Sequence, residues 1–130
     1  MNKEYEMNHE NRGFALVINN KHFPGDEIRH GSEKDVESIK KALKSLEFNV
    51  QVYQDCESFR MLDLMNLYGS MNHEDNDCSV CVIMSHSSKD NIIGVETCEI
   101  EKLTKSFKEN PSLRGKPKIF FIQACRGSVA

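Results

Sequence analysis

The sequence predicts an α/β fold in which helices cover both faces of a mostly parallel β-sheet. Short apolar runs alternate along the chain with segments whose apolar residues recur at helical spacing. The runs are continuous, as in strands that are covered on both faces. With 130 residues, 38% of them hydrophobic, the chain has the size of one domain and can bury a core of its own. These observations predict a single three-layer domain.

The first half of the chain contains two predicted strand–helix pairs. Residues 14–18 are a continuous apolar run, typical of a buried strand. Ser32 can cap a helix over residues 34–46. That helix has apolar residues at helical spacing, namely Val36, Ile39, Leu43 and Leu46. Residues 48–52 alternate as a second strand, and residues 57–68 are compatible with a second helix.

The second half continues the alternation. Residues 78–84 predict a third strand, which runs into the polar residues 85–88. After a polar loop, residues 92–94 predict a small ribbon. A third helix is indicated by the spacing of Ile100, Leu103 and Phe107, and Asn110-Pro111 ends it. Residues 118–122 predict the fourth strand. Strands that alternate with helices favour parallel pairing.

Composition and charge argue against several classes of protein. The net charge is −3, and no block of five or six like charges occurs, so neither nucleic acid nor a membrane surface is an expected partner. No apolar segment reaches the roughly 18 residues of a membrane span, and the first residues lack the apolar stretch of a signal peptide. We therefore expect a cytoplasmic protein.

The cysteines are expected to be reduced thiols. Their odd number, without a secretion signal, argues against a disulfide framework. The five are Cys56, Cys78, Cys81, Cys98 and Cys125. Cys78 and Cys81 have the spacing of a metal or redox pair, but residues three apart on a strand point to opposite faces. We expect no metal and no cofactor.

Two reactive side chains follow predicted strands. His86 comes after the third strand and Cys125 after the fourth, and open α/β sheets bind ligands beyond the carboxyl ends of their strands. Alone, a cysteine is more often a small buried residue and a loop histidine more often a surface residue. If the two strands are neighbours, the two side chains open onto the same crevice and indicate a thiol hydrolase. The other cysteines are expected in the core, and the other histidines on the surface: His9, His22, His30 and His73.

The segment around Cys125 resembles the signature of a known protein family. Gln123-Ala124-Cys125-Arg126-Gly127 matches the caspase signature around the catalytic cysteine. Further segments are similar to that family: residues 12–20, 29–35, 85–86 and 115–118. The chain resembles the large subunit of an effector-type caspase over nearly its whole length. The resemblance implies a caspase-like three-layer αβα fold whose mostly parallel sheet is completed by a separate small subunit. Residues 1–12 would be a polar N-terminal arm and residues 13–130 the catalytic domain.

The resemblance also assigns roles to individual residues. His86 would be the proton-transfer histidine and Cys125 the nucleophile. Arg29 and Gln123, together with Ser85, would line the pocket for the substrate aspartate. A guanidinium is a planar fork suited to a carboxylate, and glutamine adds a neutral donor.

The expected oxyanion hole departs from the family pattern at one position. The resemblance implies that the backbone N–H groups of Cys125 and of the residue after His86 bind the oxyanion. Caspases usually have glycine at that second position, whereas this chain has Ser87. Serine would be strained if the position required a positive φ angle. Otherwise the backbone donor would be retained.

The expected function follows from the family. The resemblance implies a cysteine endopeptidase that cleaves proteins after aspartate through a thioester and acts in apoptosis. It would be made as a zymogen, and its small subunit would complete a heterodimer that pairs into a heterotetramer. Apoptosis inhibitor proteins are further expected partners. Because the chain stops at residues 128–130, soon after the signature, we expect that point to be the processing junction.

Two rival interpretations remain at this stage. A metacaspase-like or legumain-like protease would cut after a basic residue or asparagine. Basic specificity would require acidic pocket residues, whereas Arg29 and Gln123 stand at the matching positions. The second rival is a catalytically weak or silent caspase-like scaffold, which Ser87 keeps open.

Overall fold

The computed structural model describes residues 7–20, 22–23, 27–28, 32–55, 58–88, 91–93 and 97–125. Its main sheet has six strands: β1 (Phe14–Asn19), β4 (Asn49–Gln54), β5 (Ser79–Ser88), β6 (Asn91–Ile93), β7 (Thr97–Glu99) and β8 (Lys118–Cys125). A two-stranded hairpin consists of β2 (His22–Phe23) and β3 (Glu27–Ile28). The helices are α1 (Ser32–Ser45), α2 (Ser58–Gly69) and α3 (Ile100–Glu109), followed by the 3₁₀ turn η1 (Pro111–Leu113).

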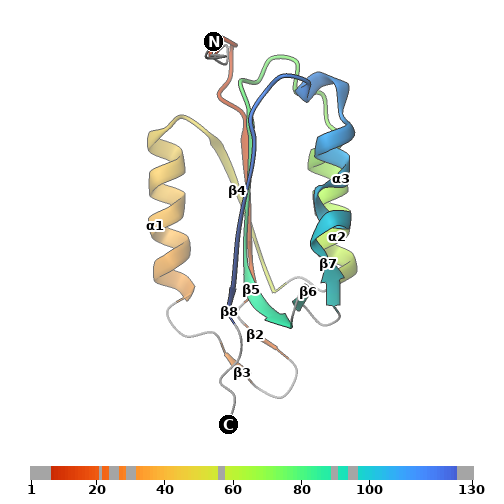
Figure 1. The fold of residues 1–130 in the computed structure, drawn as a ribbon. Coiled ribbons are helices and arrows are strands. Elements are labelled where there is room, and N and C mark those ends of the chain that lie inside the picture. The colour runs from red at the N-terminus through yellow and green to blue at the C-terminus, as the bar shows by residue number, and fades with distance from the viewer. Residues whose placement is uncertain are drawn as a thin grey trace, which may run out of the picture.

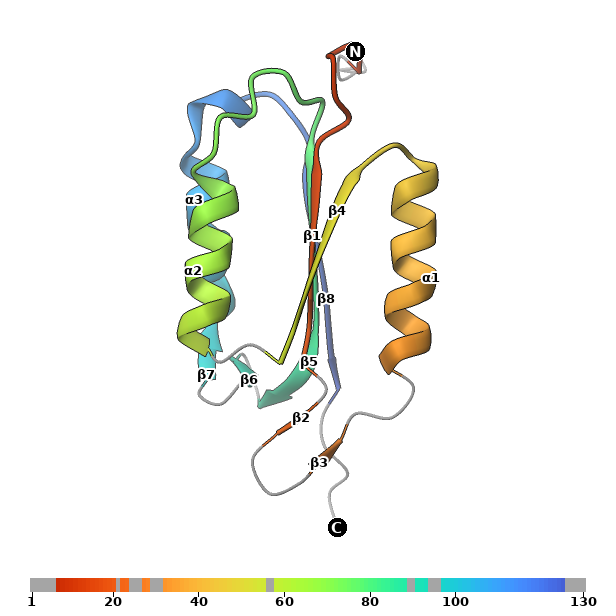
Figure 2. The same cartoon turned by 180° about the vertical axis from the view of Figure 1, so that it is seen from behind.

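The predicted parallel sheet is confirmed. Strands β4, β1, β5 and β8 lie side by side in that order, and all three pairings are parallel. Strands β6 and β7 extend the sheet with antiparallel pairing from residues 86–88 of β5. Because His86 pairs with β6 and also with β8, these two strands flank β5 on opposite edges. Helix α1 covers one face of the sheet, and α2 and α3 cover the other (Figures 1 and 2).

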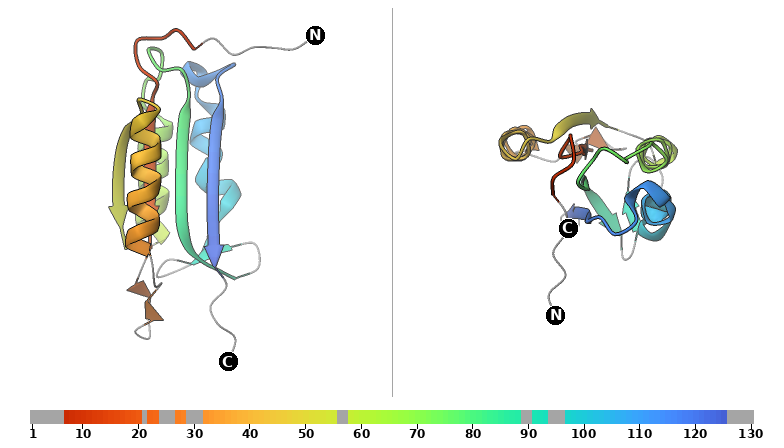
Figure 3. Two further views of the ribbon diagram at one scale, coloured as in Figure 1. Left: turned by 90° about the vertical axis from the view of Figure 1, so that its left-hand side faces the viewer. Right: turned by 90° about the horizontal axis from the view of Figure 1, so that it is seen from above.

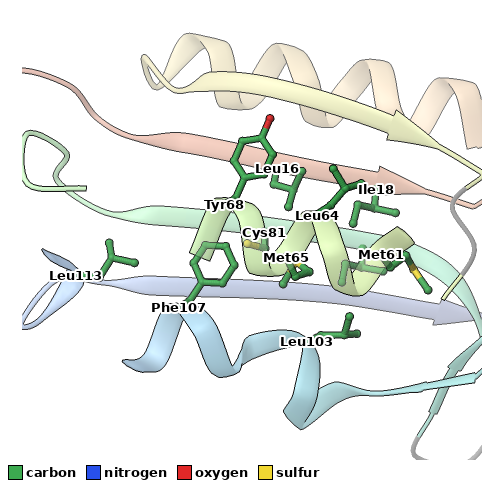
Figure 4. Close-up of a cluster of buried hydrophobic side chains, with 11 residues drawn as sticks. Leu16, Ile18, Met61, Leu64, Met65, Tyr68, Cys81, Leu103, Phe107 and Leu113 are labelled. Carbon is green, nitrogen blue, oxygen red and sulfur yellow. The ribbon is translucent and has the colours of Figure 1, made fainter. Parts of the chain in front are cut away.

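The larger core cluster fills the space between the sheet and helices α2 and α3 (Figure 4). Met61, Leu64 and Met65 of α2 are completely or almost completely buried, and Leu103 and Phe107 of α3 meet them. These positions recur at helical spacing, which brings them to one side of each helix. The sheet contributes alternate residues such as Leu16 and Ile18. Packing on this face therefore fixes β1, β5 and β8 against helices α2 and α3.

The second core cluster lies under α1. Val36 of α1 packs with the remaining alternate residues of the central strands, including Val17, Val82 and Met84. Helix α1 ends at Ser45, one residue before the predicted end, and Leu46 is 57% exposed. Glu47 then adopts a φ angle of 72°, which reverses the chain into β4.

Strand β8 is an edge strand in the described part of the chain. Its one pairing there is with β5, and its other edge is open. Helix α1 lies over β4 and β1, whereas no helix stands in front of β5 and β8 on that face (Figure 3). Two large side chains of β8, Ile119 and Phe121, are accordingly 51% and 55% exposed. None of the described helices has the length and apolar character needed to cross a membrane.

Two strands extend further than the sequence predicts. β5 continues through residues 85–88, which were expected to follow the strand, and β8 continues from Ile122 to Cys125. Pairing explains both extensions, because β8 stays in register with β5 as far as Cys125 and β6 pairs with residues 86–88. The hairpin of β2 and β3 and the strand β7 were not predicted, since two- and three-residue strands leave no periodic pattern.

Candidate active site

The two residues expected to carry the chemistry meet at one point of the sheet. Strands β5 and β8 pair through eight residues each, from Ser79 with Lys118 to His86 with Cys125. Neighbouring strands lie about 4.8 Å apart, so the backbones at His86 and Cys125 are adjacent. The thiol-hydrolase interpretation depended on the third and fourth strands being neighbours, and this condition is met. The expectation that both residues follow their strands is wrong, since each lies within a strand.

Three other predicted site residues lie beside this pair in the backbone register. Ser85 is in register with Ala124, and Gln123 with Met84. Ser87 follows His86 in β5 and is in register with Ile92 of β6. All of them are at the carboxyl end of the parallel strands, where α/β sheets bind ligands.

The predicted pocket arginine, Arg29, lies outside the described residues, in the connection between β3 and α1. Strand β3 ends directly before it, at Ile28. The hairpin of β2 and β3 lies beyond the carboxyl ends of β1, β5 and β8 (Figures 1 and 2). The preceding element therefore belongs to the same end of the sheet as His86 and Cys125.

Backbone contacts hold the end of β5 that leads to His86. Asn20 lies just after β1, and its N–H donates to the carbonyl oxygen of Met84 at 2.9 Å. The side-chain amide of Asn20, almost fully buried, donates to the Met61 sulfur of α2 at 3.2 Å. Sequence reasoning did not single out Asn20 for this contact. The polar residue that follows a buried apolar run was the available signal.

Two of the remaining cysteines, Cys78 and Cys81, are free and buried. Burial raises the pKa of the Cys81 thiol far above its ordinary value. Burial also raises the pKa of the Cys78 thiol, and the neighbouring Asp77 carboxylate raises it further. Thiols with raised pKa values are poor nucleophiles at neutral pH. Both were expected in the core, and both are there. Among the described residues, no group of three or more metal-ligating side chains occurs.

One histidine prediction is wrong. His73 was expected on the surface because its neighbours are polar, but its side chain is fully buried. The ring lies near the aromatic rings of Phe14 and Phe107 and contacts the carbonyl oxygen of Tyr68 at 2.7 Å. His9 is partly exposed and bonded to Asp77. The side chains of His22 and His30 lie outside the described part of the structure.

Comparison with known proteins places these features in a family. The model of the caspase domain matches residues 12–130. The chain is 42% identical over 129 residues to Caspase drICE of Drosophila melanogaster, covering 95% of this chain and 38% of the relative. It is 39% identical over 140 residues to Caspase-8 of Mus musculus, covering 97% and 29% respectively. Identity to Caspase-7 of Gallus gallus is 38% over 131 residues, covering 96% and 42%. The chain thus spans less than half the length of these three relatives.

Proposed function

Because this chain belongs to the caspase family, we propose that it supplies the catalytic residues of an aspartate-specific cysteine endopeptidase. One observation carries the proposal: His86 and Cys125 are register partners on adjacent parallel strands. Nucleophile and base must lie within reach of one another, and two strands joined by a ladder of hydrogen bonds hold their backbones at a fixed spacing.

In the proposed mechanism, the Cys125 sulfur attacks the carbonyl carbon of the bond after aspartate. The imidazole of His86 takes the thiol proton and delivers it to the amine that leaves, so that a thioester remains on Cys125. Water then attacks the thioester carbonyl and gives a proton to His86, which returns it to the departing Cys125 sulfur, so that the carboxylic acid and the free thiol are released. The backbone N–H groups of Ser87 and Cys125 are the proposed donors to the oxyanion in both steps.

Recognition of aspartate is proposed for three residues. Arg29 offers two parallel donors to the substrate carboxylate, and Gln123 and Ser85 complete the pocket. Two of the three lie beside the reactive pair along their own strands, since Ser85 directly precedes His86 in β5 and Gln123 is two residues before Cys125 in β8. Acidic substrates would be selected by this basic pocket, which argues against a protease that cuts after basic residues.

A small subunit is the proposed partner of this chain. Strand β8 presents an open edge among the described residues, and an unpaired edge favours addition of another strand. Ile119 and Phe121 are half-exposed and alternate with Phe120 and Ile122, which pack against the larger core cluster, so they belong to the other face of β8. No helix stands in front of β8 on that face (Figure 3). We propose that a small subunit covers both features and that two such heterodimers pair. Protein substrates with aspartate before the cleaved bond, apoptosis inhibitor proteins, a zymogen precursor and a cytoplasmic role in apoptosis belong to the same proposal.

The test is covalent labelling of the processed enzyme, with both subunits present, by an aspartyl electrophile. We expect one label on Cys125, and none in the Cys125→Ala variant. The His86→Ala variant should label more than about tenfold more slowly, because general-base assistance contributes roughly 10²–10⁴. Cys78 and Cys81 are internal controls, since their buried thiols should react only after unfolding. Absence of labelling in the folded two-subunit protein would favour the catalytically silent scaffold.

A further inference from the structure

Two loops meet at the end of the sheet opposite His86 and Cys125. The first, residues 70–78, follows Gly69 at the end of α2 and leads to β5, and the second, residues 110–117, connects α3 to β8. Side chains of the second loop bind backbone groups of the first. We call this set of contacts the clasp; its donors and acceptors are Asn110, Ser112 and Lys116 on one side and Gly69, Met71, His73 and Glu74 on the other.

Asn110 uses every hydrogen-bonding position of its side-chain amide. Its Nδ2 donates to the carbonyl oxygens of Gly69 at 2.6 Å and Met71 at 2.7 Å. Its Oδ1 accepts from the backbone N–H of Ser112 at 2.9 Å and from the Ser112 hydroxyl at 2.7 Å. The amide thus closes the end of α2 and caps η1 at the same time. Neither aspartate nor leucine could do both.

Lys116 and His73 make the second half of the clasp. The ammonium of Lys116 donates to the carbonyl oxygens of His73 at 2.8 Å and Glu74 at 3.0 Å. The backbone N–H of His73 donates to the Ser112 hydroxyl at 2.8 Å. The residue after Lys116 is bonded directly to β5, because the carbonyl oxygen of Pro117 accepts from the N–H of Ser79 at 3.1 Å. The clasp therefore ends where the β5–β8 pairing begins.

Strand β8 has few other attachments. Its hydrogen-bonded neighbour in the described part of the chain is β5 on one edge, and its α1-side face is uncovered at Ile119 and Phe121. On the opposite face, Phe120 and Ile122 pack against the larger core cluster. Within this chain one ladder holds β8, and a strand held in that way opens more easily than a central strand. The proposed small subunit would pair with the other edge of β8, which does not fix the strand against β5. Contacts that tie down the chain directly before it are therefore important for its position.

We propose that Asn110 and Lys116 are positioning residues that hold β8 against β5 and thereby keep Cys125 beside His86, a role that rests on the function proposed above. Neither residue is near the substrate, because both lie at the amino end of strands whose carboxyl ends carry the reactive pair. They act on the reaction through the strand alone.

The test combines local hydrogen exchange with kinetics in the two-subunit enzyme. The variants are Asn110→Asp, which keeps the shape but sets an oxygen against two carbonyl oxygens, and Lys116→Met, which removes the ammonium. In both, exchange of the amides of residues 119–122 should accelerate about tenfold, since the loss of two hydrogen bonds at this partly buried contact has an effect of that order. kcat for an aspartyl peptide should fall about tenfold, with KM changed by less than about twofold. Lys116→Arg, which retains donors, should restore most of both.

The matched control is Val36→Ala, a cavity variant of α1 in the other core cluster. It should lower thermal stability comparably while leaving the exchange of residues 119–122 and kcat unchanged. Any of three outcomes would overturn the proposal. Hydrogen exchange could be unaltered in both clasp variants, or exchange could accelerate while kcat stays at its full value. Alternatively, Val36→Ala could change exchange and kcat as much as the clasp variants do. If the unmodified enzyme cleaves no aspartyl peptide, the proposed function fails, whereas exchange still decides whether the clasp holds β8.

Discussion

The imidazole Nε2 of His73 donates a hydrogen bond of 2.7 Å to the carbonyl oxygen of Tyr68, and the ring is fully buried. Nδ1 lies 3.2 Å from the side-chain nitrogen of Asn76 and accepts from it. This assignment requires a neutral ring with its proton on Nε2. Burial lowers the pKa of His73, and the nearby Lys116 charge lowers it further, against the opposing effect of the Tyr68 carbonyl.

The buried ring predicts a loss of stability in mild acid. Because its folded-state pKa lies below the ordinary 6.5, the unfolded chain binds a proton that the folded chain does not. The free energy of unfolding should therefore fall as pH drops below about 6.5, by at most about 1.4 kcal/mol per pH unit from this group. Urea unfolding between pH 7.5 and 5 measures it. His73→Gln should be less stable at pH 7.5 but show a shallower slope; an unchanged slope would contradict the assignment.

We predict that the buried Asp77 carboxylate anchors residues 7–12. It accepts from the backbone N–H of His9 at 2.9 Å, lies 2.8 Å from the His9 ring nitrogen, and accepts from Arg12 at 3.2 Å. Asp77→Asn should lower the free energy of unfolding by about 2 kcal/mol, because Arg12 and His9 then face a neutral amide in place of the carboxylate. Trypsin should also cleave after Arg12 more rapidly. Glu10→Gln, an exposed neighbour, should change neither measurement.

The pH dependence of the Asp77 anchor has a definite sign. Burial alone would raise the pKa of Asp77, but the hydrogen bonds from His9 and the Arg12 charge outweigh it, so that the pKa is lowered. The stabilisation is complete above about pH 3.8 and is lost as pH falls through the lower folded-state value. Acid unfolding of Asp77→Asn should lack this transition.

The elements that the sequence predicted well are those with long apolar patterns. Strand β1 and helix α3 were found because their core residues recur at the periods of strand and helix. The polar loop with His73 was misjudged, because burial there comes from aromatic residues distant in sequence, Phe14 and Phe107. Likewise, the pairing of His86 with Cys125 depends on the order of strands in the sheet, which no local pattern contains. The family resemblance assigned both residues to one reaction, and the structure added their pairing.

We predict that a substitution of Glu47, at the end of α1, stabilises the protein. Its φ angle of 72° is in the left-handed region, which glycine adopts without strain. The N–H of Glu47 donates to the carbonyl oxygen of Lys44 at 2.9 Å and that of Phe48 to Leu43 at 3.1 Å, a helix ending that favours glycine. Glu47→Gly should raise the free energy of unfolding by about 0.5–1 kcal/mol. Glu47→Val should lower it. A loss of stability with glycine would contradict the backbone assignment.

We predict that the proposed small subunit binds over Phe121 of β8. Its side chain is 55% exposed on the face of β8 that α1 leaves uncovered (Figure 3). Phe121→Lys should leave the thermal stability of the isolated chain nearly unchanged but weaken association with the small subunit at least about tenfold, because a charge would be buried without a partner. Leu67→Lys is the matched control, since Leu67 is 59% exposed on α2, on the opposite face. Equal weakening by both variants would place the partner elsewhere.

Ser87 stands where caspases usually have glycine, and its position in the sheet argues that glycine is not required here. It lies within β5, in register with Ile92 of β6, and a strand backbone is extended, a conformation that serine adopts without strain. Ser87→Gly should therefore leave kcat unchanged within about twofold, while lowering the free energy of unfolding by roughly 0.5–1 kcal/mol, as glycine does within a strand.

Steady-state kinetics of the two-subunit enzyme and urea unfolding of the same preparations separate the two effects of Ser87→Gly. Ser87→Ala is the control for the hydroxyl alone, because it retains the backbone restriction that glycine removes. If the backbone N–H is the functional group, both variants retain kcat and only glycine loses stability. A drop in kcat of tenfold or more in both variants would show that the serine hydroxyl itself takes part in the reaction, and would overturn the backbone-donor role.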